Sequence, residues 1–310
     1  MKVLFWGTPE FALPTLDALE DEGHHVVGVV TQPDRPKGRG RKMAPSPVSA
    51  FAEAEGYEVF KPDRPRGDEF VGSIRALGAD ISVVVAYGHI LVREVLDVPE
   101  LGSINVHASL LPKLRGAAPI NWALVRGFDE TGVTVMRMVE AMDAGPILAQ
   151  QTTPISPEDN ARVLGRRLAE LGAITLVETL ALMEAGLVQE VDQDDAEATY
   201  APKLNRETAR IDWNQDAPAV ADLIRGMDDV PGAWTTLDGE PVKLFRPAVK
   251  DGGEVGPPGT VLLADQANGL LVATRVGEVS IGEVQPPGKR RMEAVQWIQG
   301  RGVQVGDRFE

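Results

Sequence analysis

The chain has no cysteine, and this absence excludes several kinds of site. None of its 310 residues is Cys, so a disulfide framework, a thiolate zinc site, an iron–sulfur cluster and a cysteine nucleophile are all ruled out. Only four histidines occur, and two of them, His24 and His25, have no partners at metal-ligand spacing. We therefore expect no metal ion at the functional site.

Long apolar runs and nucleotide-binding motifs are also missing. The apolar run at residues 3–6 is too short for a signal peptide or for a helix that spans a bilayer. Neither G-x-G-x-x-G nor G-x-x-x-x-G-K-S/T occurs, which disfavours nicotinamide and ATP. The lack of a G-x-S-x-G elbow argues against a serine hydrolase. We expect a soluble, cytoplasmic, monomeric protein that does not bind a membrane.

Basic residues are scarce overall but concentrated in one segment. The chain has 31 Lys and Arg against 46 Asp and Glu, a net charge of −15, which argues against a surface that is basic everywhere. Between Asp34 and Lys42, however, five cations accompany one anion, and interleaved Pro and Gly predict a mobile loop. Because phosphates respond to the local field, this loop is a candidate for nucleic-acid contact, with a solvated basic loop as the alternative. The cations are Arg35, Lys37, Arg39, Arg41 and Lys42. A smaller cluster, Lys289 to Arg291, fits an ordinary surface equally well.

Alternating strand and helix patterns fill the first half of the chain. Short apolar runs at residues 3–6, 26–30, 81–86 and 103–106 read as buried strands, with helical spacing at 13–22 and 164–174. Such βαβ units predict an open, mostly parallel α/β sheet, whose ligands bind beyond the carboxyl ends of its strands.

The second half has a different pattern. Short runs separated by Gly and Pro, at residues 242–245, 260–263, 270–273 and 279–281, predict a small β-barrel or sandwich. A polar stretch without periodicity lies between the halves. We therefore predict an α/β domain over residues 1–188, a linker over 189–205 and a C-terminal β domain over 206–310.

An amide and an imidazole stand close together at the end of one predicted strand. Asn105 and His107 are two residues apart, so both side chains lie on one face of the sheet. A core His satisfied by a backbone carbonyl is the alternative, but the Asn on the same face and the bent segment that follows favour a site. Asp143, in a small turn before Gly145, could instead be a turn residue. Together the three side chains suit attack on a carbonyl without a covalent enzyme intermediate.

A third candidate is the segment where another strand leaves the sheet. Its residues run from Val85 to Leu91 and include Gly88, so free backbone groups there could recognise a planar heterocycle. An ordinary exit from strand to loop is the alternative.

Motifs along nearly the whole chain resemble the methionyl-tRNA formyltransferase family. They include Phe5-x-Gly7-Thr8-Pro9, the basic segment with Pro45-Ser46-Pro47, residues 83–88, residues 104–112, Arg115-Gly116, residues 130–134, Asp143-Ala144-Gly145 and Ala209-Arg210-Ile211-Asp212-Trp213. The resemblance implies a Rossmann-like catalytic domain with an OB-like barrel. It also implies transfer of the formyl group of 10-formyltetrahydrofolate to the α-amino group of initiator methionyl-tRNA.

The resemblance also assigns roles to residues. Asn105, His107 and Asp143 would form the transfer centre. Residues of two segments would line the folate pocket: Ser109, Leu110, Leu111 and Pro112, and Val85, Ala86, Tyr87, Gly88, Ile90 and Leu91. The five cations of the basic segment would contact the tRNA acceptor stem, with Arg41 as the leading contact.

Two alternatives stay open at the level of sequence. One is another folate-dependent formyltransferase, acting on a sugar nucleotide or a purine precursor, or a formyltetrahydrofolate hydrolase. The other is a non-catalytic RNA-binding protein in which Asn105 and His107 are structural.

Overall fold

A computed structural model describes residues 1–37, 40–250 and 256–310. The described chain divides into two compact units. The first comprises residues 1–119, 131–154 and 165–201, and the second comprises residues 120–130, 155–164 and 202–310. The domain boundaries predicted from the sequence stay a prediction.

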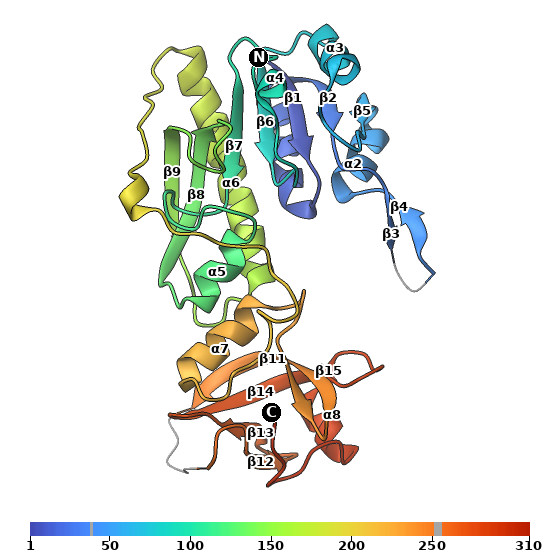
Figure 1. Ribbon diagram of the computed structural model, residues 1–310, viewed down its shortest axis with the longest axis vertical. Helices are drawn as coiled ribbons and strands as arrows, with labels where there is room; N and C mark the ends of the chain where they lie inside the picture. Colours follow the sequence, from blue (N-terminus) through green and yellow to red (C-terminus); the bar gives the residue numbers. More distant parts are fainter. Residues whose placement is uncertain (38–39, 251–255) are drawn as a thin grey trace. The chain divides into compact units, whose positions relative to one another are not determined.

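The first unit is built on a seven-stranded, mostly parallel sheet (Figure 1). Strands β1, β2, β5, β6 and β7 are parallel, and β8 is antiparallel to β7. The strand order is β5-β2-β1-β6-β7-β8-β9. The strands are β1 (Lys2–Gly7), β2 (His25–Val30), β5 (Val59–Phe60), β6 (Ile81–Val85), β7 (Ser103–His107), β8 (Glu130–Arg137) and β9 (Ile147–Pro154). The predicted α/β class and the strands expected at residues 3–6, 26–30, 81–86 and 103–106 are confirmed.

Helices cover both faces of this sheet, as the continuous apolar strands require. Val3 and Phe5 of β1 pack with helices α1, α2 and α6, whereas Leu4 and Trp6 pack with α3 and α4 on the opposite face. The helices of this unit are α1 (Leu13–Asp21), α2 (Pro47–Glu55), α3 (Asp68–Ala76), α4 (Arg93–Leu96) and α6 (Ala161–Glu184), with 3₁₀ turns η1 (Glu10–Ala12) and η2 (Asp195–Glu197). Helix α5 (Pro119–Val125) belongs, except for its first residue, to the second unit. Ser46 caps α2 by accepting a 3.0 Å hydrogen bond from the Ser49 amide.

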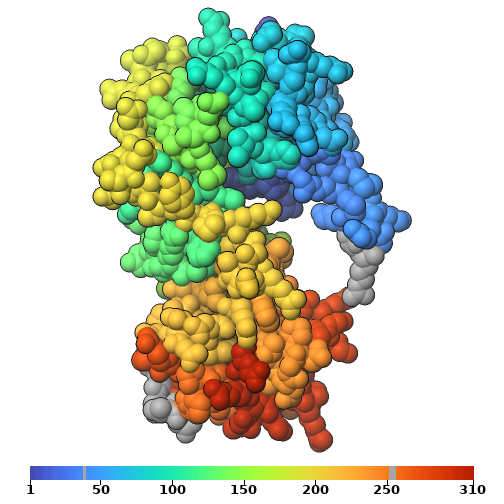
Figure 2. Space-filling view, in the orientation of Figure 1, coloured from blue at the N-terminus to red at the C-terminus, as the bar shows by residue number. Residues whose placement is uncertain are grey.

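The basic segment forms a hairpin. Strands β3 (Arg35–Lys37) and β4 (Lys42–Ala44) pair antiparallel, with Lys37 directly opposite Lys42. The prediction of a loop is therefore wrong for these two strands, because backbone pairing needs only a few extended residues on each side of a turn. Arg39 lies outside the described residues. In Figure 2 the described blue residues of the hairpin stand out from the surface of their unit.

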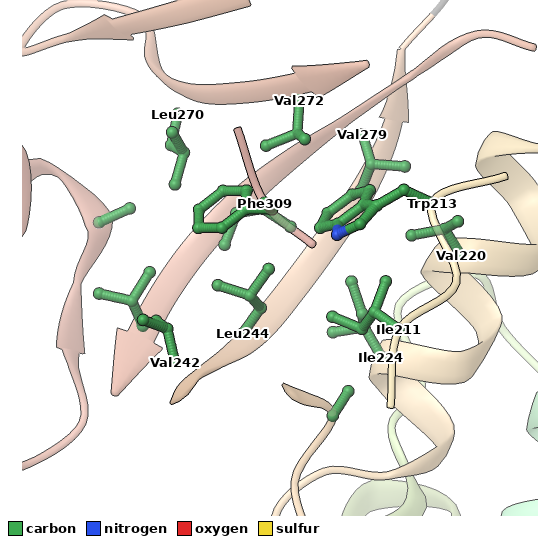
Figure 3. Close-up of a cluster of buried hydrophobic side chains, with 14 of the residues drawn as sticks. Ile211, Trp213, Val220, Ile224, Val242, Leu244, Leu270, Val272, Val279 and Phe309 are labelled. Atoms are coloured by element: carbon green, nitrogen blue, oxygen red, sulfur yellow. The ribbon is translucent and has the colours of Figure 1, made fainter. Parts of the chain in front are cut away.

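The second unit contains an antiparallel sheet, consistent with the predicted barrel. Its strand order is β10-β11-β14-β13-β12, with β15 paired to β14. The elements are α7 (Ala217–Gly226), β10 (Trp234–Leu237), β11 (Glu240–Lys250), β12 (Val261–Asp265), β13 (Gly269–Ala273), β14 (Glu278–Gln285), β15 (Met292–Glu293) and α8 (Ala294–Gln299). Trp213 stacks on Phe309 at 5.7 Å within the core of this unit (Figure 3). No helix among the described residues is both long and apolar enough to cross a bilayer.

Candidate active site

The amide and imidazole predicted to form a site lie at the carboxyl end of β7. In the strand register Asn105 lies opposite Val84 and Met136, and His107 lies opposite Thr134. Their neighbours Ile104 and Val106 face the core on the α1, α2 and α6 side, so alternation directs Asn105 and His107 to the other face. Their exposed fractions are 9% and 6%. Within the described residues the Asn105 side chain has no hydrogen-bond partner, so its amide is free to bind a ligand.

Both nitrogens of His107 have an assigned neighbour. Nε2 lies 3.0 Å from the carbonyl oxygen of Leu114, and because a carbonyl only accepts, Nε2 carries a hydrogen. Nδ1 lies 3.7 Å from Oδ2 of Asp143. The same Oδ2 accepts a 2.8 Å hydrogen bond from the backbone amide of Gly116. The structure therefore brings His107 and Asp143 together, and leaves Nδ1 as the ring atom that can serve a ligand.

The segment after β7 is held by a network centred on Thr134. The Thr134 hydroxyl donates to the Ser109 carbonyl at 2.6 Å and accepts from the Leu111 amide at 3.1 Å. Ser109 is fully buried, and its hydroxyl donates to the Lys113 carbonyl at 2.6 Å. Gln150 donates to the Leu111 carbonyl at 2.8 Å. Leu111 is also buried, whereas Leu110 and Pro112 are half-buried, so the last two offer more side-chain surface to a ligand.

The exit from β6 alternates between buried and exposed residues. Among the residues predicted to line the folate pocket, Val85, Tyr87 and Leu91 are buried, and Ala86, Gly88 and Ile90 are exposed. The Tyr87 carbonyl accepts hydrogen bonds of 2.9 Å from the Thr8 hydroxyl and from the Gln32 amide. This exit is thereby fixed to the segments that follow β1 and β2. A ligand at this edge would meet the exposed residues and the backbone, while the buried side chains anchor the segment.

The hairpin carries its cations on the surface. Arg35, Lys37, Arg41 and Lys42 are all exposed. Within the described residues, no carboxylate lies within ion-pair distance of Lys37, Arg41 or Lys42. Like charges opposite each other on paired strands repel, so an anion placed near Lys37 and Lys42 would relieve that repulsion. The Arg35 guanidinium instead donates to the Gln32 side-chain oxygen.

Two residues beside this centre had no predicted role, although Arg115 lies in one of the motifs that carry the resemblance. Arg115 is only 4% exposed, and its guanidinium binds Gln193 and Asp195. Gln193 lies in the polar stretch predicted to be a linker. That stretch contains Val191, which forms a β-bridge with Ile147. This isolated apolar residue was the one feature of the sequence that could have indicated that the stretch packs against the domain. Among the described residues, no cluster of three or more His, Cys, Asp or Glu is arranged to hold a metal ion.

Comparisons with known proteins place this architecture in a family. The "Formyl transferase" family model matches residues 1–180, and "Formyl transferase, C-terminal domain" matches residues 203–302. Methionyl-tRNA formyltransferase of Geotalea uraniireducens (strain Rf4) is 47% identical over 306 residues, which cover 99% of this chain and 97% of the relative.

Solved structures share the fold at low identity. HypX from Aquifex aeolicus, in complex with tetrahydrofolic acid, matches with a TM-score of 0.69 and 21% identity, and the match covers 98% of this chain. This chain spans about half the length of HypX, since the match covers 48% of it. WlaRD, a sugar 3N-formyl transferase with dTDP and 5-N-formyl-THF, matches with a TM-score of 0.68 and 16% identity over 94% of this chain and 99% of WlaRD.

Proposed function

Because this chain belongs to the methionyl-tRNA formyltransferase family, we propose that it transfers the formyl group of 10-formyltetrahydrofolate to the α-amino group of initiator methionyl-tRNA. The full-length match to curated methionyl-tRNA formyltransferases at 44–47% identity carries this conclusion. The same match disfavours a sugar or purine acceptor, a hydrolase and a non-catalytic RNA-binding protein. The neighbours that act on sugars are far less similar and share only the fold.

In the proposed mechanism Asn105 and His107 stabilise the oxygen of the formyl group. The amine attacks the formyl carbon, and the carbonyl oxygen gains negative charge as the carbon becomes tetrahedral. The unpartnered Asn105 amide can donate to that oxygen. His107 is held through Nε2 by the Leu114 carbonyl, so its Nδ1 is the ring atom that would face the oxygen. Nδ1 can donate to that oxygen only when both ring nitrogens carry a hydrogen, so in this mechanism His107 acts as the imidazolium beside the Asp143 carboxylate.

Asp143 would act as the general base that accepts the proton lost by the attacking amine. Its Oδ2 lies 3.7 Å from Nδ1 of His107, and it is a carboxylate with an exposed side-chain fraction of 17%. A carboxylate at this position can accept the proton directly or through water, as general base catalysis requires. The folate nitrogen then leaves with the electron pair of the carbon–nitrogen bond that breaks and takes up a proton, so the proton lost by the amine is balanced by the one gained on the leaving nitrogen.

The two substrates would meet different parts of the chain. The exposed residues of the β6 exit, Ala86, Gly88 and Ile90, together with the segment 109–112, would line the folate pocket within the proposed domain 1–188. The hairpin cations would contact phosphates of the tRNA, and the proposed domain 206–310 would add further tRNA contacts. We also propose that the protein acts as a monomer in the cytoplasm, where charged initiator tRNA is used.

A label-transfer assay tests the function. The full chain is incubated with 10-formyltetrahydrofolate labelled in the formyl group, and label is followed into charged initiator tRNA, uncharged tRNA, an amino-sugar nucleotide and free formate. Transfer to the charged tRNA alone is expected. Label that appears only in the sugar nucleotide would show a sugar formyltransferase, and label only in formate would show a hydrolase; either result would contradict the proposed function.

A further inference from the structure

Residues 191–201 form backbone hydrogen bonds with two segments that carry residues of the candidate site. Val191 exchanges backbone hydrogen bonds of 2.8 and 2.9 Å with Ile147. Farther along, the Arg115 amide donates to the Thr199 carbonyl at 2.9 Å, and the Ala201 amide donates to the Arg115 carbonyl at 2.8 Å. All of these residues belong to the first unit. The segment is therefore paired at both of its ends with the parts of the chain that carry Asp143 and Gly116.

Gln193 lies between these two pairings, and its amide group is fully used. Nε2 donates to the carbonyl oxygens of Asp143 at 2.9 Å and of Gly145 at 2.8 Å. Oε1 accepts from Nε and Nη2 of Arg115 at 3.1 and 2.8 Å. Two donors thus face two carbonyls, and two lone pairs face two guanidinium hydrogens. The opposite orientation of the amide would set donors against donors, so this network determines how the side chain is oriented.

The turn that Gln193 binds is under conformational constraint. Asp143 has a φ of +52°, a region that non-glycine residues occupy at some energetic cost. A Cβ built on Gly145 would lie 1.9 Å from the carbonyl oxygen of Arg137, so the turn is packed closely against β8. The two hydrogen bonds from Gln193 bracket Ala144 and hold this turn. The same turn determines where the Asp143 carboxylate lies relative to His107.

We propose that Gln193 is a positioning residue for formyl transfer. It links the buried Arg115 guanidinium to the Asp143 turn, and so keeps the Asp143 carboxylate between Nδ1 of His107 and the Gly116 amide. The proposal rests on the proposed function of the same site. It predicts that loss of the Gln193 side-chain amide lowers turnover without weakening the binding of either substrate, because Gln193 contacts neither the formyl group nor the attacking amine.

Two substitutions separate positioning of the Asp143 turn from a second role, acceptance of the Arg115 hydrogen bonds; the charge of Arg115 is already paired with Asp195. Gln193→Met keeps the approximate size and removes the hydrogen bonds to Arg115, Asp143 and Gly145. Gln193→Glu keeps the acceptors for Arg115 but places a carboxylate oxygen against the carbonyls of Asp143 and Gly145. If Gln193 positions the Asp143 turn, both variants lose activity, whereas Glu would be tolerated if the only task were to accept the hydrogen bonds from Arg115.

The experiment measures kcat, the KM for each substrate and the thermal unfolding midpoint of the full chain. Gln151→Met is the matched control, because among the described residues the Gln151 side chain donates to the exposed Glu178 side chain and to no group of the candidate site. We expect kcat to fall about 30- to 100-fold in both Gln193 variants, the scale of a catalytic group displaced by about 1 Å. Both KM values, the unfolding midpoint and tetrahydrofolate binding should stay near those of the control.

Each other outcome overturns the proposal. Wild-type kinetics in Gln193→Met, or activity retained in Gln193→Glu alone, would exclude positioning of Asp143. A fall in kcat and in the unfolding midpoint together with a rise in both KM values would show a merely structural role. A wild-type chain that transfers no formyl group to tRNA would instead overturn the proposed function, and the positioning role with it.

Discussion

Oδ2 of Asp143 lies 3.7 Å from Nδ1 of His107, with the Gly116 amide 2.8 Å from the same oxygen. One carboxylate oxygen thus faces both an imidazole and a backbone donor. The hydrogen bond fixes the carboxylate, and the imidazole gives it a neighbour with which protons can be exchanged. This relationship leads directly to the first prediction.

Asp143→Asn should lower kcat by about 100-fold or more, in the range expected for loss of a general base. Asn tolerates the positive φ of this position, so the backbone should be preserved while the charge is lost. Formyl-transfer kinetics measure the effect, with Asp192→Asn, at an exposed position, as control. A variant that keeps wild-type turnover would remove Asp143 from the mechanism.

Asn105→Ala should lower kcat by about 100- to 1,000-fold, as for other donors to a developing oxyanion. The side chain has no hydrogen-bond partner among the described residues, so its removal leaves no protein group unpaired there. Thermal stability should therefore change little. Asn268→Ala, at an exposed turn, is the control, and equal turnover in the two variants would contradict the oxyanion role.

Arg41→Gln should weaken tRNA binding and leave tetrahydrofolate binding unchanged. The change keeps much of the side-chain length but removes one exposed cation, so the slope of log K against log salt should become shallower by about 1. Binding titrations at several salt concentrations measure it. Arg75→Gln, on helix α3 away from the hairpin (Figure 1), should behave as wild type, and a folate defect in Arg41→Gln would refute the assignment of the hairpin.

Tyr87→Phe should reduce the loss of stability at alkaline pH. Burial raises the pKa of Tyr87 to about 12, whereas in the unfolded chain the phenol titrates near pH ~10. Between these values the folded state holds the additional proton, so the free energy of unfolding falls as pH rises through this window. Below about pH 10 the phenol is neutral in both states and contributes no pH dependence.

Urea unfolding at pH 8 and at several values above 10 tests this prediction. At pH 8 the Phe variant should be as stable as wild type or more stable, because the Tyr87 hydroxyl is buried without a partner among the described residues. Above pH 10 its stability should decline less steeply. Identical alkaline slopes in the two proteins would contradict the prediction.

Local patterns were sufficient for much of the fold and for part of the site. Apolar runs such as 81–86, alternating with helical patterns, favour strands of a sheet covered on both faces, because apolar residues on both faces need packing on both faces. Alternation along a strand is enough to place Asn105 and His107 on one face. The resemblance added the roles of those residues, which still await mutational tests.

Other features depend on contacts between residues distant in the sequence. The hairpin at 35–44 has an ordinary loop composition, and only pairing of Lys37 with Lys42 reveals its strands. The polar stretch around Gln193 has no periodicity, because its partners are carbonyls in another turn and a guanidinium in another loop. Hydrogen bonds of this kind leave no repeating pattern in either segment.

The sequence by itself determined the α/β class, the pairing of Asn105 with His107 on one strand and the concentration of positive charge at residues 35–42. Each of these features depends on residues that are close together in the sequence, through side-chain alternation along a strand or through local composition. Only the tertiary structure decided that Asp143 faces His107, that Gly116 fixes its carboxylate and that Gln193 holds the turn. Those relationships arise because the sheet brings loops that are far apart in the sequence to one edge. The spacing of residues within each loop does not reveal which other loop will lie beside it.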